Sequence, residues 1–346
     1  MTGEIFWKRV PNAVRFLSDA VDELLAGESV LLQFPVEAPW KDLMTDVLAE
    51  NLSPFLNTRS IDRYSATEAD SPGEFLLHRY FSERERQNYW PAHGSVEAFM
   101  AKNRNSPMHH RIIFVTDIPE AQVSAWIASV SEYLEHAGDP DDAALFVLMT
   151  ARTAFGGSDA VTMLDYSEYI SDYDCLMLCM NLLSDQRCSD MEKKYISELS
   201  VRLADNRIEF AGQLAEYGCD LLRTPIGVVR TVMSELTDGE AAELTEQSLW
   251  EAQIRIVYPE LEHFRRSMVR KYQSKLQSFL PMTDALGERI TDPGDLELGQ
   301  IFYICRNAHF ADKRDFDRLC SMRSARNLLA HGNAIPYDEL KKLGVL

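Results

Sequence analysis

Short strand-like runs constrain the fold of the first half of this chain more than any other feature. Four of them are rich in Val, Ile, Leu or Phe and have the length of a buried strand, and a fifth, at residues 58–64, is a weak candidate. They cover residues 29–35, 58–64, 111–117, 144–150 and 161–165. Segments with helical spacing of apolar residues lie at 12–26, 40–52 and 119–137. Because continuous apolar strands that alternate with helices are typical of parallel sheets, we expect residues 1–165 to form an α/β domain.

The pattern turns helical after the last of these runs and stays helical to the end. Residues 166–238 predict a helical lid, and the turn-forming sequence Thr-Asp-Gly-Glu at 237–240 marks a boundary. Apolar stripes beyond it predict an antiparallel bundle of four or five helices at 239–346. The expected organisation is therefore an α/β domain, a lid and an all-α bundle.

Residues 312–331, DKRDFDRLCSMRSARNLLAH, give the clearest helix of the predicted bundle. His-Gly-Asn and then Pro336 provide its stop signal. On a wheel of about 100° per residue the helix has an apolar face and a polar arc. The apolar face holds Met322, Ala325, Leu328 and Leu329. The polar arc holds Arg323, Arg326, Asn327 and His331. Guanidinium, amide and imidazole groups on one arc form a candidate site.

The segment Arg326-Asn327-Leu-Leu-Ala-His331 matches the motif R-N-x-x-x-H, and residues 244–346 resemble HEPN domains. These are all-helical modules found in many prokaryotic ribonucleases. The resemblance implies that two protomers cut RNA without metal, with the ribose 2′-hydroxyl as nucleophile. It implies that Arg326 stabilises phosphate charge, His331 assists proton transfer or contacts phosphate, and Asn327 orients the substrate. The alternative is that Arg326 and His331 cap or bridge helices in a structural bundle.

The motif also occurs at Arg104-Asn105-Ser-Pro-Met-His109. Pro107 lies inside this second match, and no apolar period surrounds it. Proline disrupts a helix interior, so we expect no helix and no site there.

The layout of the first half resembles P-loop ATPase cores of the AAA or STAND type. In this comparison Asp117 stands where such proteins keep the Walker B acid, and Thr150 stands near a sensor position. The motif G-x-x-x-x-G-K-[ST] is missing, and no Gly-Lys pair occurs in the chain. Residues 35–42 read Pro-Val-Glu-Ala-Pro-Trp-Lys-Asp, without the glycines that let backbone N–H groups converge on phosphate. We expect a degenerate, non-hydrolysing scaffold without a cofactor, with Lys41 a relic or a surface lysine.

The formal net charge of −19 limits where nucleic acid can bind. Residues 1–239 carry 20 Lys and Arg against 38 Asp and Glu, whereas residues 240–346 carry 15 against 16. Repulsion disfavours RNA on the first part and leaves the C-terminal domain as its place. A basic run at 265–275 is more often a solvated helix face than a binding site.

The remaining features predict a cytoplasmic protein without a membrane segment or a metal. No run of about 18 apolar residues occurs, and the start of the chain lacks the apolar segment of a signal peptide. Six cysteines fit reduced thiols; Cys175 and Cys179 share a helical face, but no partners stand at zinc-finger spacing. Residues 66–107 read as a long insertion that holds one helix near 71–86 and a contact surface.

These features support two main hypotheses. The first is a non-catalytic or regulatory subunit of a bacterial defence or conflict assembly, the setting that both resemblances imply. It would bind a protein partner, such as an intact ATPase or an effector subunit, as a homodimer or hetero-oligomer. The alternative is a metal-independent HEPN endoribonuclease, a toxin or effector with Arg326, Asn327 and His331 at a composite dimer site. An active ATPase with an unusual loop is a third. The acidic first part and the missing phosphate loop favour the first.

Overall fold

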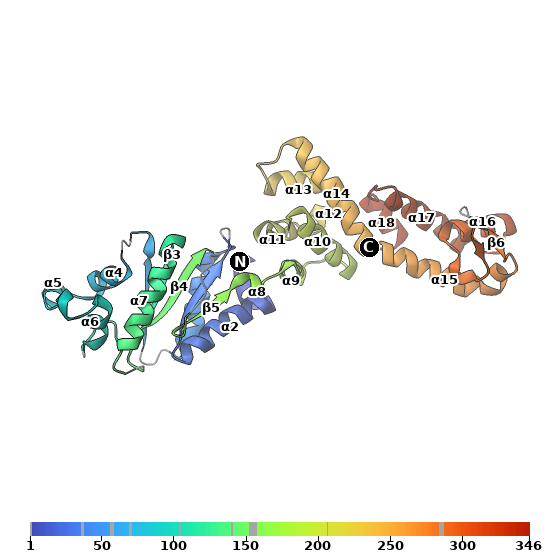
Figure 1. The fold of residues 1–346 in the computed structure, drawn as a ribbon. Coiled ribbons are helices and arrows are strands. Elements are labelled where there is room, and N and C mark those ends of the chain that lie inside the picture. The colour runs from blue at the N-terminus through green and yellow to red at the C-terminus, as the bar shows by residue number, and fades with distance from the viewer. Residues whose placement is uncertain are drawn as a thin grey trace. The chain divides into compact units, whose positions relative to one another are not determined.

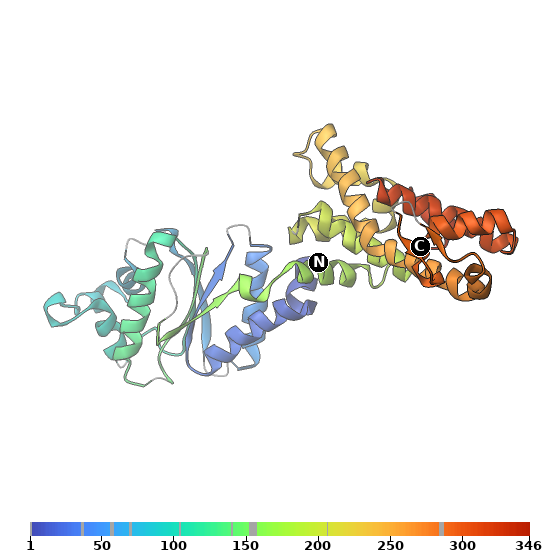
Figure 2. The same cartoon turned by 45° about the vertical axis from the view of Figure 1, so that its right-hand side comes forward.

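The computed structural model describes residues 2–346 apart from 36–37, 56–58, 69–70, 104, 140, 152–157, 206 and 284–286. The chain divides into two compact units, Met1–Asp174 and Cys175–Leu346 (Figures 1 and 2). The first unit contains a parallel sheet with helices, and the second is almost entirely helical. The predicted α/β region followed by a helical region is confirmed at this level.

The first unit is built on a five-stranded sheet in which all neighbouring strands are parallel. Its strands are β1 (Ser29–Phe34), β2 (Ser60–Ser65), β3 (Arg111–Ile118), β4 (Leu145–Ala151) and β5 (Val161–Asp165). They lie in the order β2-β3-β4-β1-β5, and all five predicted strands are confirmed. Every residue of β1 is buried because β4 and β5 flank it, whereas the edge strand β2 has no fully buried residue.

Helices lie on both faces of this sheet, as crossover connections between parallel strands require (Figures 1 and 2). One group contains α1 (Thr2–Arg9), α2 (Pro11–Leu25) and α3 (Lys41–Leu52), which pack against one another. The other contains α4 (Pro72–Tyr80), α6 (Val96–Lys102) and α7 (Val123–His136). Two short helices, α5 (Glu83–Arg86) and α8 (Tyr166–Tyr169), complete the unit. The three predicted helices are confirmed as α2, α3 and α7, and the helix expected near 71–86 is divided into α4 and α5.

The second unit contains helices α9 to α18 and a short hairpin. The helices before the predicted bundle are α9 (Asp172–Leu183), α10 (Asp190–Leu203), α11 (Ile208–Glu216), α12 (Cys219–Arg223) and α13 (Pro225–Val232). The helices of the predicted bundle region are α14 (Asp238–Ile256), α15 (Tyr258–Gln277), α16 (Leu298–Ala308), α17 (Lys313–Ala330) and α18 (Tyr337–Leu343). The hairpin pairs β6 (Met282–Thr283) with β7 (Arg289–Ile290). None of the helices in the described ranges has both the length and the apolar character needed to cross a bilayer.

A buried amide joins three segments of the second unit. Gln253 of α14 is 1% exposed, and its Nε2 donates to the Tyr195 hydroxyl of α10 at 2.7 Å and to the Ile335 carbonyl at 2.8 Å. Its Oε1 accepts from the Ile335 N–H at 2.7 Å. Since α10 lies in the predicted lid and α14 in the predicted bundle, the two segments share one core, whose buried residues run from Cys175 to Val345.

Candidate functional site

The carboxyl ends of β1 and β3 bring Lys41 and Asp117 together. Lys41 is the first residue of α3, which follows β1, and Asp117 lies near the end of β3. Open α/β sheets bind ligands along the edge formed by the carboxyl ends of their strands. The Lys41 ammonium nitrogen lies 2.9 Å from Asp117 Oδ1. The two residues, 76 positions apart in the chain, therefore form one ion pair at the edge where a ligand is expected.

Two hydroxyl groups also bind the Asp117 carboxylate. Thr116 Oγ1 donates to Asp117 Oδ2 at 2.8 Å, and Ser65 Oγ at the end of β2 donates to it at 3.3 Å. Burial acts to raise the pKa of Asp117, but the hydrogen bonds from Lys41, Thr116 and Ser65 outweigh it and hold the pKa below its ordinary value. The carboxylate is 49% exposed, so water screens the ion pair. Asp117 is thus an anion whose charge Lys41 already balances.

The backbone of β3 is irregular at Asp117. Asp117 has φ of 57°, in the left-handed region that non-glycine residues seldom adopt. The pairing of β3 with β4 shifts between Val115 and Ile118, which marks a bulge. Such bulges redirect a side chain at the rim of a sheet. Thr150, which the sequence places near a sensor position, donates from Oγ1 to the Ile118 carbonyl at 2.9 Å and so fixes the backbone beside Asp117.

An aromatic residue precedes α3 where a phosphate loop needs small residues. Trp40 has φ of 47°, and its ring centroid lies 5.8 Å from that of Phe6 in α1. Gly3 lies against the indole, because a Cβ at Gly3 would be 2.6 Å from Trp40 Cγ. The start of α3 is therefore packed against α1. Val36 and Glu37, which belong to the predicted degenerate loop, lie outside the described residues.

The helix predicted at residues 312–331 is present as α17. The Asp312 side chain accepts from the Asp315 N–H at 2.9 Å at its start, and His331 is its C-cap residue. The buried residues of α17 are Leu319, Met322, Ala325 and Leu329. Three of these belong to the predicted apolar face, and the fourth predicted member, Leu328, is half-buried.

The three residues predicted to be catalytic have different surroundings. Arg326 Nη2 pairs with Glu297 Oε2 at 3.0 Å, and Glu297 is the N-cap residue of α16. Asn327 is half-buried and His331 is exposed. Within the described part of the chain, neither side chain has a polar partner, and no side-chain hydrogen bond joins the three residues; only the His331 backbone N–H donates to the Asn327 carbonyl, at 3.1 Å. The helix therefore presents them at one end without assembling them, and their catalytic role stays a prediction.

Three of the five basic residues in the run at 265–275 pair with nearby carboxylates. Arg265 and Arg266 both bond to Glu262, at 2.6 Å and 3.0 Å. The hydrogen bond from Arg265, against the effect of burial and with help from Arg266, lowers the pKa of Glu262 to about 2. Lys271 pairs with Asp312 at 2.8 Å. These pairs agree with a solvated, salt-bridged helix face.

The second match to the motif does not form a helix where it is described. Arg104 lies outside the described residues. Residues 105–110 contain turns, as the position of Pro107 predicts.

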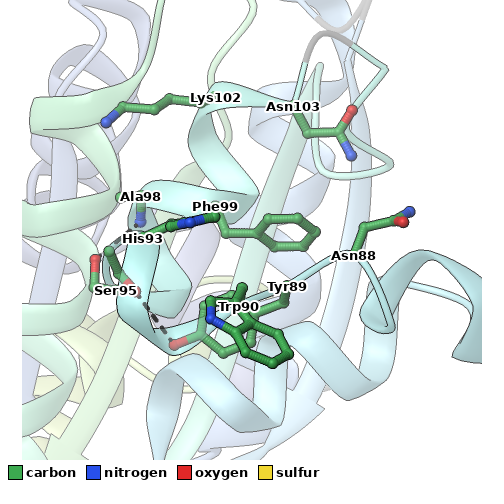
Figure 3. A pocket seen from close by; sticks show the side chains of 10 residues that line it. Asn88, Tyr89, Trp90, His93, Ser95, Ala98, Phe99, Lys102 and Asn103 are labelled. Atoms are coloured by element: carbon green, nitrogen blue, oxygen red, sulfur yellow. Dashed lines mark hydrogen bonds between the residues drawn. The ribbon is translucent and has the colours of Figure 1, made fainter.

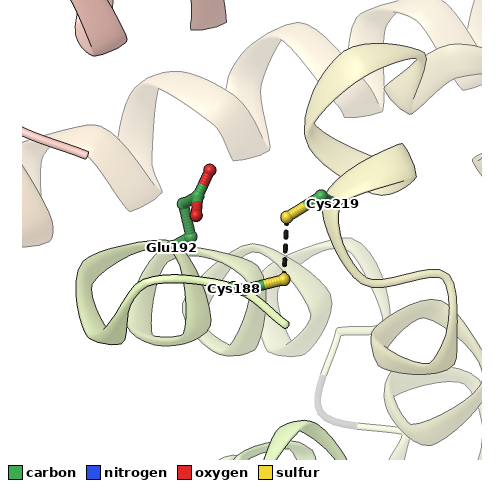
Figure 4. A group of neighbouring side chains, drawn as sticks. All are labelled: Cys188, Glu192 and Cys219. Carbon is green, nitrogen blue, oxygen red and sulfur yellow. Dashed lines mark hydrogen bonds between the residues drawn. The ribbon is translucent and has the colours of Figure 1, made fainter. Parts of the chain in front are cut away.

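Two clusters were not predicted from the sequence. The insertion between β2 and β3 lines a cavity of about 340 Å³ with Tyr89, Trp90, Phe99 and Lys102 (Figure 3). The rings of Tyr89 and Phe99 lie 5.5 Å apart, and Trp90 is 64% exposed. The pair of adjacent aromatic residues at 89–90, within a polar stretch, is the sequence feature that could have predicted this cavity. The second cluster contains Cys188, Cys219 and Glu192 (Figure 4). The two cysteines lie 31 positions apart in the sequence, so no local motif predicts that they meet.

No family model and no curated protein matches the chain. Two structures of mutant Thermotoga maritima RuvB are similar at 15% and 17% identity, each with a TM-score of 0.35. The alignments cover 70% and 72% of this chain and 75% and 78% of the RuvB chains. Similarity at this level does not establish a common fold.

Proposed function

We propose that this protein is a non-catalytic, regulatory subunit of a bacterial defence or conflict assembly. Its first unit is an ATPase-like scaffold that neither binds nor hydrolyses ATP, and residues 239–346 are a HEPN-like domain. The five-stranded, all-parallel sheet supports the scaffold, since the resemblance to AAA-type ATPase cores implies a parallel α/β sheet.

The ion pair between Lys41 and Asp117 is the observation that carries this proposal. In a P-loop ATPase the loop lysine contacts the β- and γ-phosphates, and an acid on a neighbouring strand helps to hold magnesium. Here the lysine and the acid at the equivalent places bind each other at 2.9 Å. Trp40, packed on α1, occupies the position before the lysine, and no glycine lies between residues 34 and 41. The two charges that would serve a nucleotide therefore satisfy one another.

Thermal denaturation with and without magnesium and ATP tests the scaffold proposal. The full chain should show the same melting temperature in both conditions and no phosphate release above background. A ligand present at a hundredfold excess over its Kd stabilises the folded state by about 2.7 kcal/mol, which is readily detected. Asp117→Asn frees Lys41 and serves as the comparison variant. Stabilisation of the wild-type chain by ATP, or hydrolysis that Lys41→Ala abolishes, would show an active nucleotide site and contradict the proposal.

The proposed partner is a protein, namely an intact ATPase or an effector subunit. Large aromatic side chains are strongly exposed on both units: Trp90 at 64% and Tyr173 at 65% on the first, and Tyr303 of α16 at 62% on the second. Exposed aromatic residues are frequent anchors of protein contacts. Co-expression of the full chain with the products of adjacent genes, followed by chromatography with light scattering, should give a hetero-oligomer or a homodimer. Trp90→Ala or Tyr303→Ala should weaken it, whereas a monomer under all these conditions would contradict the assembly.

A metal-independent HEPN endoribonuclease is the second candidate. The formation of α17 supports it, because the helix ends with an exposed His331 about 1.4 turns after Arg326. The pairing of Arg326 with Glu297 weighs against it, since that carboxylate occupies the place of a phosphate. Incubation of the full chain with RNA in EDTA separates the candidates: cleavage would support the nuclease, and intact RNA would support the non-catalytic subunit.

A further inference from the structure

Cys188 and Cys219 face one another in the second unit. Cys188 lies just before α10, Cys219 is the first residue of α12, and their sulfur atoms are 2.7 Å apart (Figure 4). Both thiols are half-buried and free. Thirty-one residues separate them, so the contact joins two segments of the fold rather than successive turns of one helix.

The Gln186 side chain lies between the two cysteine-bearing segments. Gly218 has φ of 54°, a conformation that favours glycine, and a Cβ there would lie 2.1 Å from Gln186 Oε1. The Gln186 amide donates to the Glu216 carbonyl at 3.5 Å. Gln186 and Gly218 are thus neighbours of Cys188 and Cys219 in the chain and touch in space. The Gln186 side chain therefore links the two segments beside the cysteines.

We propose that Cys188 and Cys219 form a reversible disulfide that ties the segment before α10 to the start of α12. The oxidant is a small-molecule disulfide of the glutathione class. One cysteine attacks it, forms a mixed disulfide and releases one small thiol. The second cysteine attacks the protein sulfur of that mixed disulfide and releases the other small thiol. Two cysteine thiols lose two electrons and two protons, which the two released thiols carry. This modification is independent of the function proposed above.

A metal ion shared by the same residues fits less well. Two sulfurs on a tetrahedral zinc, each bonded at about 2.3 Å, lie roughly 3.8 Å apart, well beyond 2.7 Å. The third available ligand, Glu192, is already engaged. Its Oε1 accepts from the Tyr337 hydroxyl at 2.6 Å and lies 3.1 Å from Lys341 Nζ, while its Oε2 accepts from the Ser189 N–H at 2.8 Å. The Lys341 cation beside this carboxylate also opposes a second cation.

The electrostatic setting makes the dithiol form slow to react. Burial, the hydrogen bond with Cys188 and the nearby Glu192 anion raise the pKa of Cys219 to about 12. A thiolate, not a thiol, attacks disulfides, so the Cys219 thiol attacks slowly near neutral pH.

Mass spectrometry of the full-length protein tests the modification directly. The protein is incubated with oxidised glutathione or with dithiothreitol, alkylated, digested without reduction and analysed. The oxidised sample should contain a linked pair of peptides bearing Cys188 and Cys219, which dithiothreitol removes. The oxidised protein should melt about 5–10 °C higher than the reduced protein. Cys188→Ser and Cys219→Ser should abolish this difference, and Cys219→Ser should retain glutathione on Cys188. Cys320→Ser, which changes a half-buried thiol on α17, should behave as wild type.

Two results would overturn the proposal. Complete alkylation of both cysteines after prolonged treatment of the wild-type protein with oxidised glutathione would show that the bond does not form. One equivalent of zinc bound to the wild-type chain and lost in Cys188→Ser would assign the cluster to a metal instead. The first result is measured on the wild-type protein, so it holds even if a serine variant fails to fold.

Discussion

Replacement of Gln253 by alanine is expected to destabilise the second unit by at least about 3 kcal/mol. The amide satisfies the Tyr195 hydroxyl, the Ile335 N–H and the Ile335 carbonyl, all at 2.7–2.8 Å, and is itself 1% exposed. A buried polar group left without a partner costs about 1–3 kcal/mol, and the substitution leaves three. The cavity left by the side chain adds to this cost.

Chemical denaturation of the full chain, followed by circular dichroism, measures the loss. Hydrogen exchange reports the site itself, because the Ile335 amide donates to Gln253 and should lose protection in the variant. Gln247→Ala is the matched control: it lies on the same helix, is exposed and bonds to Glu251, so we expect a change within about 0.5 kcal/mol. A loss below about 1 kcal/mol for Gln253→Ala with unchanged protection at Ile335 would refute the view that this amide ties the two helical segments together.

Three further predictions concern the candidate RNA site, the loss of stability at low pH and the packing of α1. If the ribonuclease alternative holds, Arg326→Ala and His331→Ala should each slow RNA cleavage by about 10²-fold or more, and His109→Ala should have no effect. The products formed in EDTA should end in 2′,3′-cyclic phosphate. Equal cleavage by all variants would exclude this site. Burial acts to raise the pKa of Glu192, but hydrogen bonds from Tyr337, Ser189 and Lys341 outweigh this effect and lower the pKa to about 2. The ionised Glu192 therefore stabilises the fold above the ordinary pKa of 4.5, and this stabilisation is lost as pH falls towards 2. Acid unfolding of Tyr337→Phe should therefore begin at higher pH than that of wild type, and overlapping curves would contradict this. Gly3→Ala should lower the melting temperature, because the added Cβ would lie 2.6 Å from Trp40 Cγ. Gly239→Ala in α14 should leave the melting temperature unchanged, because open space surrounds that position. An unchanged melting temperature in Gly3→Ala would mean that α1 does not pack against Trp40.

The strands could be predicted because burial on both faces leaves an uninterrupted apolar run. This holds for β1 and β4, in which nearly every residue is buried. The order of the strands could not be predicted, because it depends on crossover connections that no local pattern records. Helix α1 was not predicted because Ile5, Phe6 and Trp7 are consecutive and show no helical period over eight residues. The two-residue strands of the hairpin are too short to give any pattern.

The candidate site was only partly predictable for a related reason. The position of Asp117 after a buried strand was visible in the sequence, and so was Lys41 at the start of a helix. Their bond was not, since it requires the end of β3 to lie beside the start of α3. Cys188 and Cys219 show the same limit, because Gly218 and Gln186 bring them together only in the folded chain. Helix α17 and its apolar face could be predicted because the helical spacing of its apolar residues lies within one continuous stretch of the sequence.

The bond between Lys41 and Asp117 also bears on how the first unit responds to the energy state of the cell. A working nucleotide switch has opposite charges at its sheet edge that remain unbalanced until a nucleotide and its metal arrive, and its shape follows the ratio of triphosphate to diphosphate. In this chain Lys41 and Asp117 balance each other's charge without any ligand. Under the proposed function the first unit does not respond to the nucleotide supply, so any timing in the proposed assembly has to come from the proposed partner.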